Sequence, residues 1–211
     1  MRMHRCLIVF ASVAALAPAT LTAQGPSNSP PERTGFYGMI GAGYGDAMFE
    51  TNSVYSNNGA GMYMLTLGYM LDPRWRLGVE MDYVISPDAG SYSFGCCNST
   101  AAYYSASVAY YDDASSHLWF KGNLGYSTYN ATYFTGNNPG GGAGMYLPYS
   151  NGGIAAGLGI GYDVRLGKGG VLMSPFLSYE RQLSTTQLPG VSGASGRQSF
   201  LFAGLGVGYN R

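Results

Sequence analysis

Apolar and polar residues alternate with a period of two along most of this chain. In Trp75–Tyr83 every odd position is apolar or aromatic, and the even positions are Arg, Gly, Glu and Asp. Residues 156–166 and 201–209 repeat this alternation. Because successive side chains of a β-strand point to opposite faces, the pattern predicts strands that each have one apolar face. No segment sustains a helical period instead.

Eight segments of the chain have this alternation. We expect strands at residues 36–46, 60–71, 75–86, 101–111, 117–129, 153–166, 171–183 and 198–209. Each is roughly 10 to 14 residues long, whereas strands of soluble proteins are usually nearer five or six. About 9–11 tilted residues suffice for a strand to cross a bilayer. The lengths therefore favour strands that span a membrane.

The connections between these strands alternate strictly between short and long. The long ones cover residues 47–59, 87–100, 130–152 and 184–197, so all of them lie at one end of the strands. Transmembrane barrels have this asymmetry, with short periplasmic turns and longer extracellular loops. The sequence therefore predicts an all-β fold, an eight-stranded antiparallel up-and-down transmembrane β-barrel. A water-soluble β-barrel or sandwich is the alternative.

Aromatic residues on the apolar faces form two rings around an aliphatic belt. Near the short turns they are Phe36, Tyr69, Trp75, Tyr110, Tyr162 and Tyr209. Near the long loops they are Tyr44, Tyr63, Tyr83, Tyr104, Tyr126 and Tyr179. Aromatic residues concentrate at both interfaces of a bilayer, so this distribution favours the membrane over water.

The N-terminus has the features of a secretory signal peptide. A basic start is followed by the apolar run Cys6–Ala17, which is too short to span a membrane, and then by small residues up to Ala23. We expect residues 1–23 to be removed, with a buried N-terminal helix as the alternative. Residues 24–34 would then be a short periplasmic segment and residues 35–211 a barrel domain in the bacterial outer membrane.

Several strands read Gly-x-Gly-x-Gly-aromatic, as in Gly157–Tyr162 and Gly204–Tyr209. Over residues 34–211 this pattern resembles the small outer-membrane barrels of the OmpA, OmpX and Ail kind. The resemblance implies outer-membrane lipid, lipopolysaccharide and the barrel-assembly machinery as partners. Such barrels usually end on an aromatic residue, whereas here Asn210 and Arg211 follow Tyr209.

The inward positions hold charges of both signs. Because an eight-stranded barrel is filled by side chains, and buried charges are tolerable only when paired, we predict an ion-pair network in the lumen. Its expected members are Arg76, Glu80, Asp82, Lys121, Asp163, Arg165 and Glu180. Glu80 and Lys121 lie at similar depth and are the expected central pair.

Inward glycines line the first and last strands, Gly41, Gly43 and Gly45 on one and Gly204, Gly206 and Gly208 on the other. We expect them to leave room for Trp119 and Lys121, which reach across from the far wall. A narrow cleft that holds water or a ligand is the alternative. Pro175 lies inside the expected strand 171–183, where it removes a backbone donor, and predicts a local irregularity.

Little in the sequence indicates a cofactor, a metal or catalysis. Eleven Lys and Arg residues balance eleven Asp and Glu residues, which argues against nucleic acid as a partner. Cys96 and Cys97 are adjacent in a long loop and suggest a loop disulfide of some kind, whereas two thiolates without a nearby histidine make a poor metal site. His117 lies at the short-turn end, away from the outer leaflet where a lipid A enzyme would act.

The four long loops are rich in Tyr, Asn, Ser and Gly, a composition that suits adaptable recognition. We therefore expect a structural or surface-interaction role without enzymatic activity. A small pore or ligand-passing barrel is the first alternative. A lipid A-modifying enzyme that uses His117 is the second.

Overall fold

The computed structural model describes residues 33–51, 55–86, 99–135, 145–167, 170–187 and 195–210. The expected signal peptide and the pair Cys96 and Cys97 lie outside these residues. Within the described ranges the chain forms β-strands and no helix, so no helix there is long and apolar enough to cross a membrane.

The described residues form ten strands in chain order. They are β1 (Gly35–Thr51), β2 (Tyr55–Met70), β3 (Trp75–Ser86), β4 (Ser99–Tyr111), β5 (Leu118–Thr135), β6 (Met145–Tyr162), β7 (Val164–Arg165), β8 (Val171–Gln182), β9 (Thr186–Gln187) and β10 (Ser195–Asn210). Eight of them are long, and β7 and β9 are two-residue strands beside the ends of β8 and β10.

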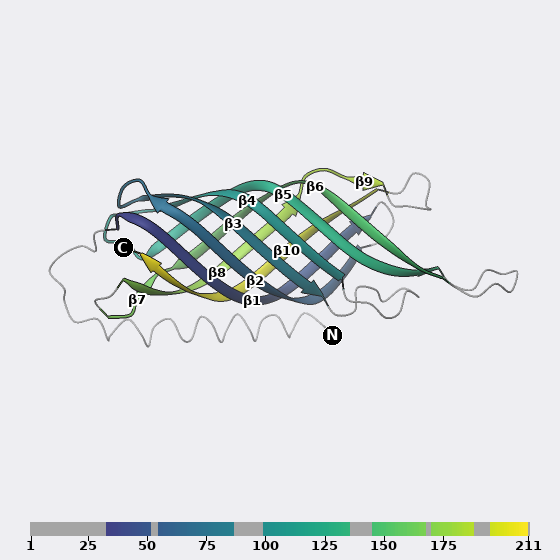
Figure 1. Ribbon diagram of the computed structural model, residues 1–211, viewed down its shortest axis with the longest axis horizontal. Coiled ribbons are helices and arrows are strands. Elements are labelled where there is room, and N and C mark those ends of the chain that lie inside the picture. The colour runs from purple at the N-terminus through teal and green to yellow at the C-terminus, as the bar shows by residue number, and fades with distance from the viewer. Residues whose placement is uncertain are drawn as a thin grey trace, which may run out of the picture.

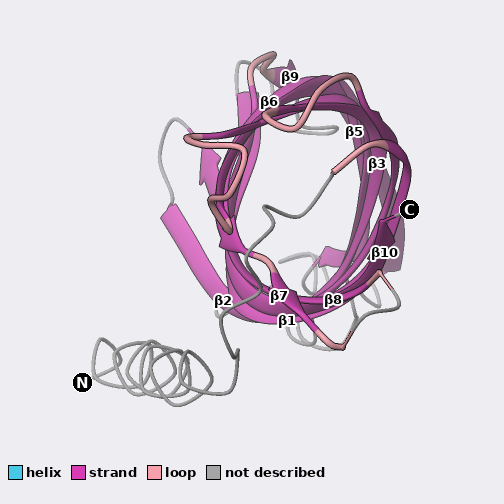
Figure 2. Ribbon diagram, turned by 90° about the vertical axis from the view of Figure 1, so that its left-hand side faces the viewer, coloured by secondary structure: helices cyan, strands magenta, loops and turns pink. Residues whose placement is uncertain are grey.

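The long strands close into a barrel. Neighbours in the chain pair antiparallel from β1 to β6, β6 pairs with β8, and β8 pairs with β10 (Figure 1). The ring is completed by β1 and β10, whose ladder runs from Tyr37 opposite Asn210 to Thr51 opposite Gly196. Figure 2 looks along the barrel and shows the strands as a ring. The eight-stranded antiparallel up-and-down barrel that the sequence predicts is confirmed.

The outer face of this barrel is apolar. The most exposed large hydrophobic residues include Ile40 and Leu158, which are 66% and 69% exposed, and most of the predicted aromatic rings are exposed as well. A continuous apolar belt of this kind would make the protein aggregate in water but suits the hydrocarbon core of a bilayer. The outer face of the barrel is therefore that of a protein whose strands span a bilayer.

Several strands extend further toward the long-loop end than the sequence pattern predicts. β1 continues to Thr51 and β2 starts at Tyr55, so much of the expected loop 47–59 is paired strand. The expected loop 130–152 is likewise reduced, because β5 and β6 stay paired as far as Thr135 and Met145. Figure 1 shows this hairpin projecting beyond the rest of the barrel wall.

The irregularity expected at Pro175 falls on the neighbouring strand. β8 itself is continuous and pairs with β10 through Pro175 opposite Leu205. On its other side the partner strand is interrupted at Asp163, between the end of β6 and the start of β7, in the register that faces Ser174 and Pro175. Proline has no N–H to donate, so the ladder on this side is interrupted where a donor is missing.

Candidate functional site

A first polar layer lies in the lumen near the short-turn end and is centred on Asp163. Tyr111 Oη donates to Asp163 Oδ2 at 2.7 Å, Trp119 Nε1 donates to Oδ1 at 2.9 Å, and Ser174 Oγ donates to Oδ1 as well. Asp163 continues the inward alternation of β6 at the break between β6 and β7, and it is 1% exposed. Three donors compensate the loss of water around this carboxylate.

Arg76 joins the same layer through aromatic rings. Its Nη1 donates to Tyr111 Oη at 3.2 Å, and its guanidinium lies 4.0 Å from the centre of the Tyr37 ring. Arg33, just before β1, stacks on the ring of Tyr111, with its guanidinium 4.1 Å from the ring centre. Arg76 and Asp163 are therefore connected through Tyr111 instead of forming a direct ion pair.

A second polar layer lies further toward the long loops and contains the ion pair between Lys121 and Glu80. Both side chains are buried, with 2% and 1% of their surface exposed. Thr66 Oγ1 donates to Glu80 Oε2 at 3.1 Å, and Asn123 Nδ2 donates to Glu80 Oε1 at 3.2 Å. Glu80 therefore accepts hydrogen bonds on both oxygens, which is what a buried carboxylate requires.

Two further carboxylates face this ion pair. Asp82 and Glu180 each offer an oxygen within 4.8 Å of one from Glu80, and all three side chains are buried. Asn123 Nδ2 donates to Glu180 Oε1 at 3.2 Å, whereas neither oxygen of Asp82 accepts a hydrogen bond from a described residue. Carboxylate oxygens are ligands of hard cations, but here the Lys121 ammonium pairs with Glu80 and its positive charge acts on all three carboxylates.

The structure thus divides the predicted network into two layers. Glu80, Asp82, Lys121 and Glu180 meet in one layer, and Arg76 and Asp163 in the other. Arg165 joins neither layer through an ion pair among the described residues, and it lies half-buried on β7. Cys96 and Cys97 lie outside the described residues.

The ion-pair network predicted from the sequence contained charged residues alone, so it omitted three neutral partners that the structure shows. Tyr111, Thr66 and Ser174 each donate to a buried carboxylate. All three occupy inward positions of their strands, so the alternation itself could have identified them as candidates.

The expected role of the glycine wall is wrong. A Cβ at Gly41 would lie 3.0 Å from Met64 Cε and 3.3 Å from Phe176 Cε1, so these two side chains fill the space. Trp119 and Lys121 instead lie against Gly161 and Gly159 of the adjacent strand β6. The β6 glycines therefore make room for Trp119 and Lys121. The glycines of β1 and β10 make room for apolar side chains such as Met39, Met64 and Phe176.

Large side chains fill the described lumen. Trp119, Tyr37, Tyr111, Phe202 and Met62 are all among its largest fully buried residues. Near the short-turn end, Arg76 lies 5.4 Å from the Trp119 ring and 4.0 Å from the Tyr37 ring, so these groups pack face to face across the interior. This packing agrees with the expectation that an eight-stranded barrel has no room for an open channel.

His117 lies between the turn 112–116 and β5. Burial lowers the pKa of its imidazole, and the positive charge of Arg33 lowers it further. The nearest acidic turn residue, Asp113, accepts hydrogen bonds from Ser115 N at 2.7 Å and Ser115 Oγ at 2.9 Å, and these bonds lower its pKa. The described contacts therefore do not assemble serine, histidine and an acid into a triad.

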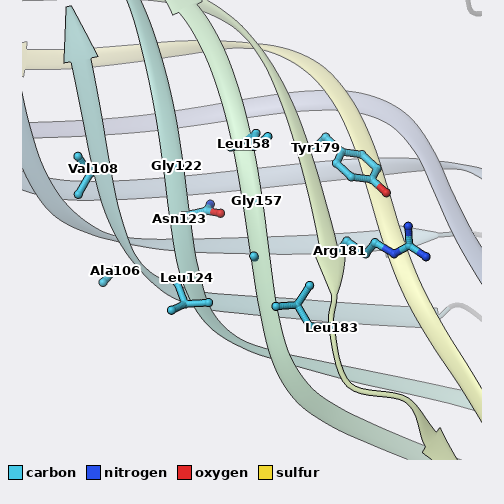
Figure 3. A pocket seen from close by; sticks show the side chains of 11 residues that line it. Ala106, Val108, Gly122, Asn123, Leu124, Gly157, Leu158, Tyr179, Arg181 and Leu183 are labelled. Atoms are coloured by element: carbon cyan, nitrogen blue, oxygen red, sulfur yellow. The ribbon is translucent and has the colours of Figure 1, made fainter.

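The lipid-facing wall has a shallow groove of about 760 Å³ across β4, β5, β6 and β8. Figure 3 shows the side chains around it. Its floor is formed by small residues, and its flanks by larger apolar ones. The lining residues are Ala106, Val108, Gly122, Asn123, Leu124, Ala156, Gly157, Leu158, Tyr179, Arg181 and Leu183.

Comparison with known proteins gives matches in structure and none in sequence. No protein-family model matches the chain, and no curated protein matches its sequence. Ail, the attachment invasion locus protein of Yersinia pestis, superposes with a TM-score of 0.54 at 14% identity, over 83% of this chain and 99% of Ail. Neisserial surface protein A gives a TM-score of 0.49 at 18% identity, over 82% of this chain and 97% of its own. The N-terminal barrel domain of Pseudomonas aeruginosa OprF gives 0.42 at 14% identity, over 84% and 98%. The closed barrel and its superposition on Ail together show that this chain has the fold of the small eight-stranded outer-membrane β-barrel proteins.

Proposed function

We propose that this barrel anchors a recognition surface on the outside of the cell, and that the projecting part of the β5–β6 hairpin is its main binding element. The observation that carries the proposal is the length of this hairpin. Both strands are 18 residues long and paired throughout, whereas about 9–11 residues suffice to cross a bilayer. Membrane anchoring alone does not require the additional residues.

The projecting residues have the composition of a binding surface. Residues 131–135 and 145–149 include Tyr133, Phe134, Tyr146 and Tyr149. Tyrosine and phenylalanine provide large contact areas at low cost in conformational entropy, which is why they are common in paratopes.

The backbone of the same segment also has free pairing positions. The β4–β5 ladder ends at Thr100 opposite Asn130, and the β6–β8 ladder begins at Ala155 opposite Gln182. In the described ladders, residues 131–135 therefore pair on one side only. An edge of this kind can accept an extended peptide as an added strand.

The packed lumen favours this role over the alternative of a small pore. Trp119, Tyr37 and Tyr111 are each 1% exposed or less, and they occupy the interior near the short turns. Conductance across planar bilayers containing the purified barrel tests this alternative. We expect no stepwise currents, and stable single-channel steps from the folded protein would favour the pore.

The binding role is tested by removing the projection and keeping the barrel. An Asn-Gly turn in place of residues 131–149 joins Asn130 to Ser150, which face each other in the ladder, and this dipeptide closes two-residue hairpins. Cells that express the full or the trimmed protein are compared on arrays of extracellular-matrix proteins and glycans. We expect at least one ligand to bind the full protein and to lose most binding to the trimmed one.

A gel-mobility shift between unheated and boiled samples shows that both proteins are folded. Identical binding profiles from two folded proteins would contradict the proposed role of the hairpin, and the barrel would then have a structural role.

A further inference from the structure

The groove on the outer wall is a second candidate site, and it is independent of the β5–β6 projection. Two adjacent rows of outward residues cross the four strands. The first row contains Val108, Gly122, Leu158 and Tyr179, and the second, nearer the long loops, contains Ala106, Leu124, Ala156 and Arg181. Gly122 in the first row and Ala106 and Ala156 in the second are small, so the wall is hollow between larger neighbours (Figure 3).

The space above Gly122 is open. A Cβ placed on Gly122 would meet no atom within 4 Å, whereas Leu124 and Leu158 beside it are 59% and 69% exposed. The groove therefore has an apolar floor and apolar flanks, and it lies in the part of the wall that faces hydrocarbon. An extended hydrocarbon chain fits this shape, because it can contact the floor and both flanks at once.

One end of the groove is cationic. Arg181 lies at the long-loop end, one row beyond Tyr179, which belongs to the aromatic ring expected at the outer interface. Its side chain is 40% exposed, and its Nη2 donates to Glu50 Oε2 at 3.2 Å. Glu50 also faces Arg197 in the β1–β10 ladder, and Asp46 lies on the same outward face of β1 at the level of Tyr179, so two guanidinium groups and two carboxylates lie here.

A guanidinium has five N–H donors, and a phosphate accepts them in pairs. The site thus combines an apolar groove in the hydrocarbon region with a partly exposed guanidinium at the outer interface. These features complement an anionic amphiphile whose chain lies in the groove and whose phosphate lies outside it. A lipid of the outer leaflet has this orientation.

We infer that the groove binds one acyl chain of lipopolysaccharide, with a lipid A phosphate held by Arg181. Charge complementarity favours this occupant over a second copy of the barrel, since an identical wall would bring a second Arg181 toward the first. The open space at Gly122 determines how deeply the acyl chain lies in the groove. Arg181 distinguishes a phosphate from an uncharged or zwitterionic headgroup.

The test uses the refolded, lipid-free barrel in detergent and native mass spectrometry. Purified lipid A, its dephosphorylated form and phosphatidylcholine are added separately at equal concentration. Gly122→Leu fills part of the groove, and its Cβ would meet no atom within 4 Å. Gly61→Leu is the matched control, because a Cβ at Gly61 also meets no atom within 4 Å and the residue lies on β2, outside the groove. Arg181→Gln removes the charge and keeps the groove.

We expect wild type and Gly61→Leu to retain one lipid A, and Gly122→Leu to lose it by about tenfold. Arg181→Gln is expected to bind lipid A and its dephosphorylated form equally and to lose about tenfold toward lipid A. Equal retention by Gly122→Leu and wild type overturns the proposal, as does equal retention of phosphatidylcholine and lipid A by the wild type. A dimer that Gly122→Leu abolishes would assign the groove to a second copy instead. A mobility shift on boiling verifies that each variant is folded.

Discussion

Lys121 on β5 reaches Glu80 on β3, 41 residues earlier in the chain, across the intervening strand β4. The contact is possible because the inward residues of β4 between Glu80 and Lys121 are Ser105, Ser107 and Ala109, which are too small to separate the two side chains. The ion pair thus joins three strands in a lumen where water does not screen the charges. Breaking this buried pair should therefore lower the free energy of unfolding more than breaking an exposed pair.

Lys121→Met is expected to lower the free energy of unfolding by about 3–5 kcal/mol, because it leaves Glu80 charged and buried beside two other carboxylates. Urea unfolding of the barrel in lipid vesicles measures the change. Arg181→Met provides the comparison, since its pair with Glu50 is exposed and worth only about 0–1 kcal/mol. Similar losses for the two variants would show that the buried pair is not special.

Asp82→Asn is expected to leave stability unchanged or to increase it. Among the described residues near Lys121, three carboxylates share one ammonium, and Asp82 accepts no hydrogen bond from them. An amide of the same shape leaves two acidic groups in place of three beside the single Lys121 ammonium. Glu80→Gln, which breaks the ion pair, should be destabilising in the same unfolding experiment. If Asp82→Asn is as harmful as Glu80→Gln, then Asp82 has a stabilising partner in the folded protein.

Gly43→Val should prevent closure of the barrel. A Cβ at Gly43 would lie 2.8 Å from the Ala203 carbonyl oxygen and 3.2 Å from Gly204 Cα, and both belong to the backbone of β10, which cannot yield as a flexible side chain would. Gly61→Val meets no atom within 4 Å and serves as the control. We expect the mobility shift on boiling to be lost in the first variant and kept in the second. A normal shift for Gly43→Val would mean that the β1–β10 seam is adaptable.

Acidification is expected to weaken the barrel through His117. Burial lowers its pKa in the folded state below the ordinary 6.5, so the unfolded chain takes up a proton first as the pH falls. The stability contributed by neutral His117 is therefore present above pH 6.5 and is lost as the pH falls through the lower folded pKa. Unfolding midpoints between about pH 5 and 8 should depend less on pH in His117→Gln than in wild type. Parallel profiles for the two proteins would contradict this role.

The strands in the membrane were predictable because lipid imposes a strict pattern on them. Each outward residue must be apolar, so segments such as Trp75–Tyr83 alternate clearly and are found with their strand boundaries. Beyond the bilayer this constraint ends. Residues 131–135 and 145–152 form paired strand, but apolar and polar residues do not alternate regularly there. The sequence pattern therefore did not predict this pairing.

The lumen was predictable in part, for a related reason. Alternation determines which residues face inward, and strand register gives their depth, so Glu80 and Lys121 could be assigned to the same level. Which neighbour fills a given space depends on side-chain length and direction across several strands. Met64 and Phe176 cover Gly41 for this reason, and nothing in the sequence around Gly41 identifies them.

The ladder between β1 and β10 has a consequence for the order of events during assembly. Tyr37 lies opposite Asn210, so the barrel is sealed by contacts between residues at nearly opposite ends of the chain. Such contacts have the greatest loop-closure entropy to overcome and form late. A chain whose synthesis is interrupted before β10 has two open sheet edges and no sealed wall. Only a chain that has been synthesised and exported through β10 can therefore close its wall, so the β1–β10 seam makes barrel closure the last step of assembly.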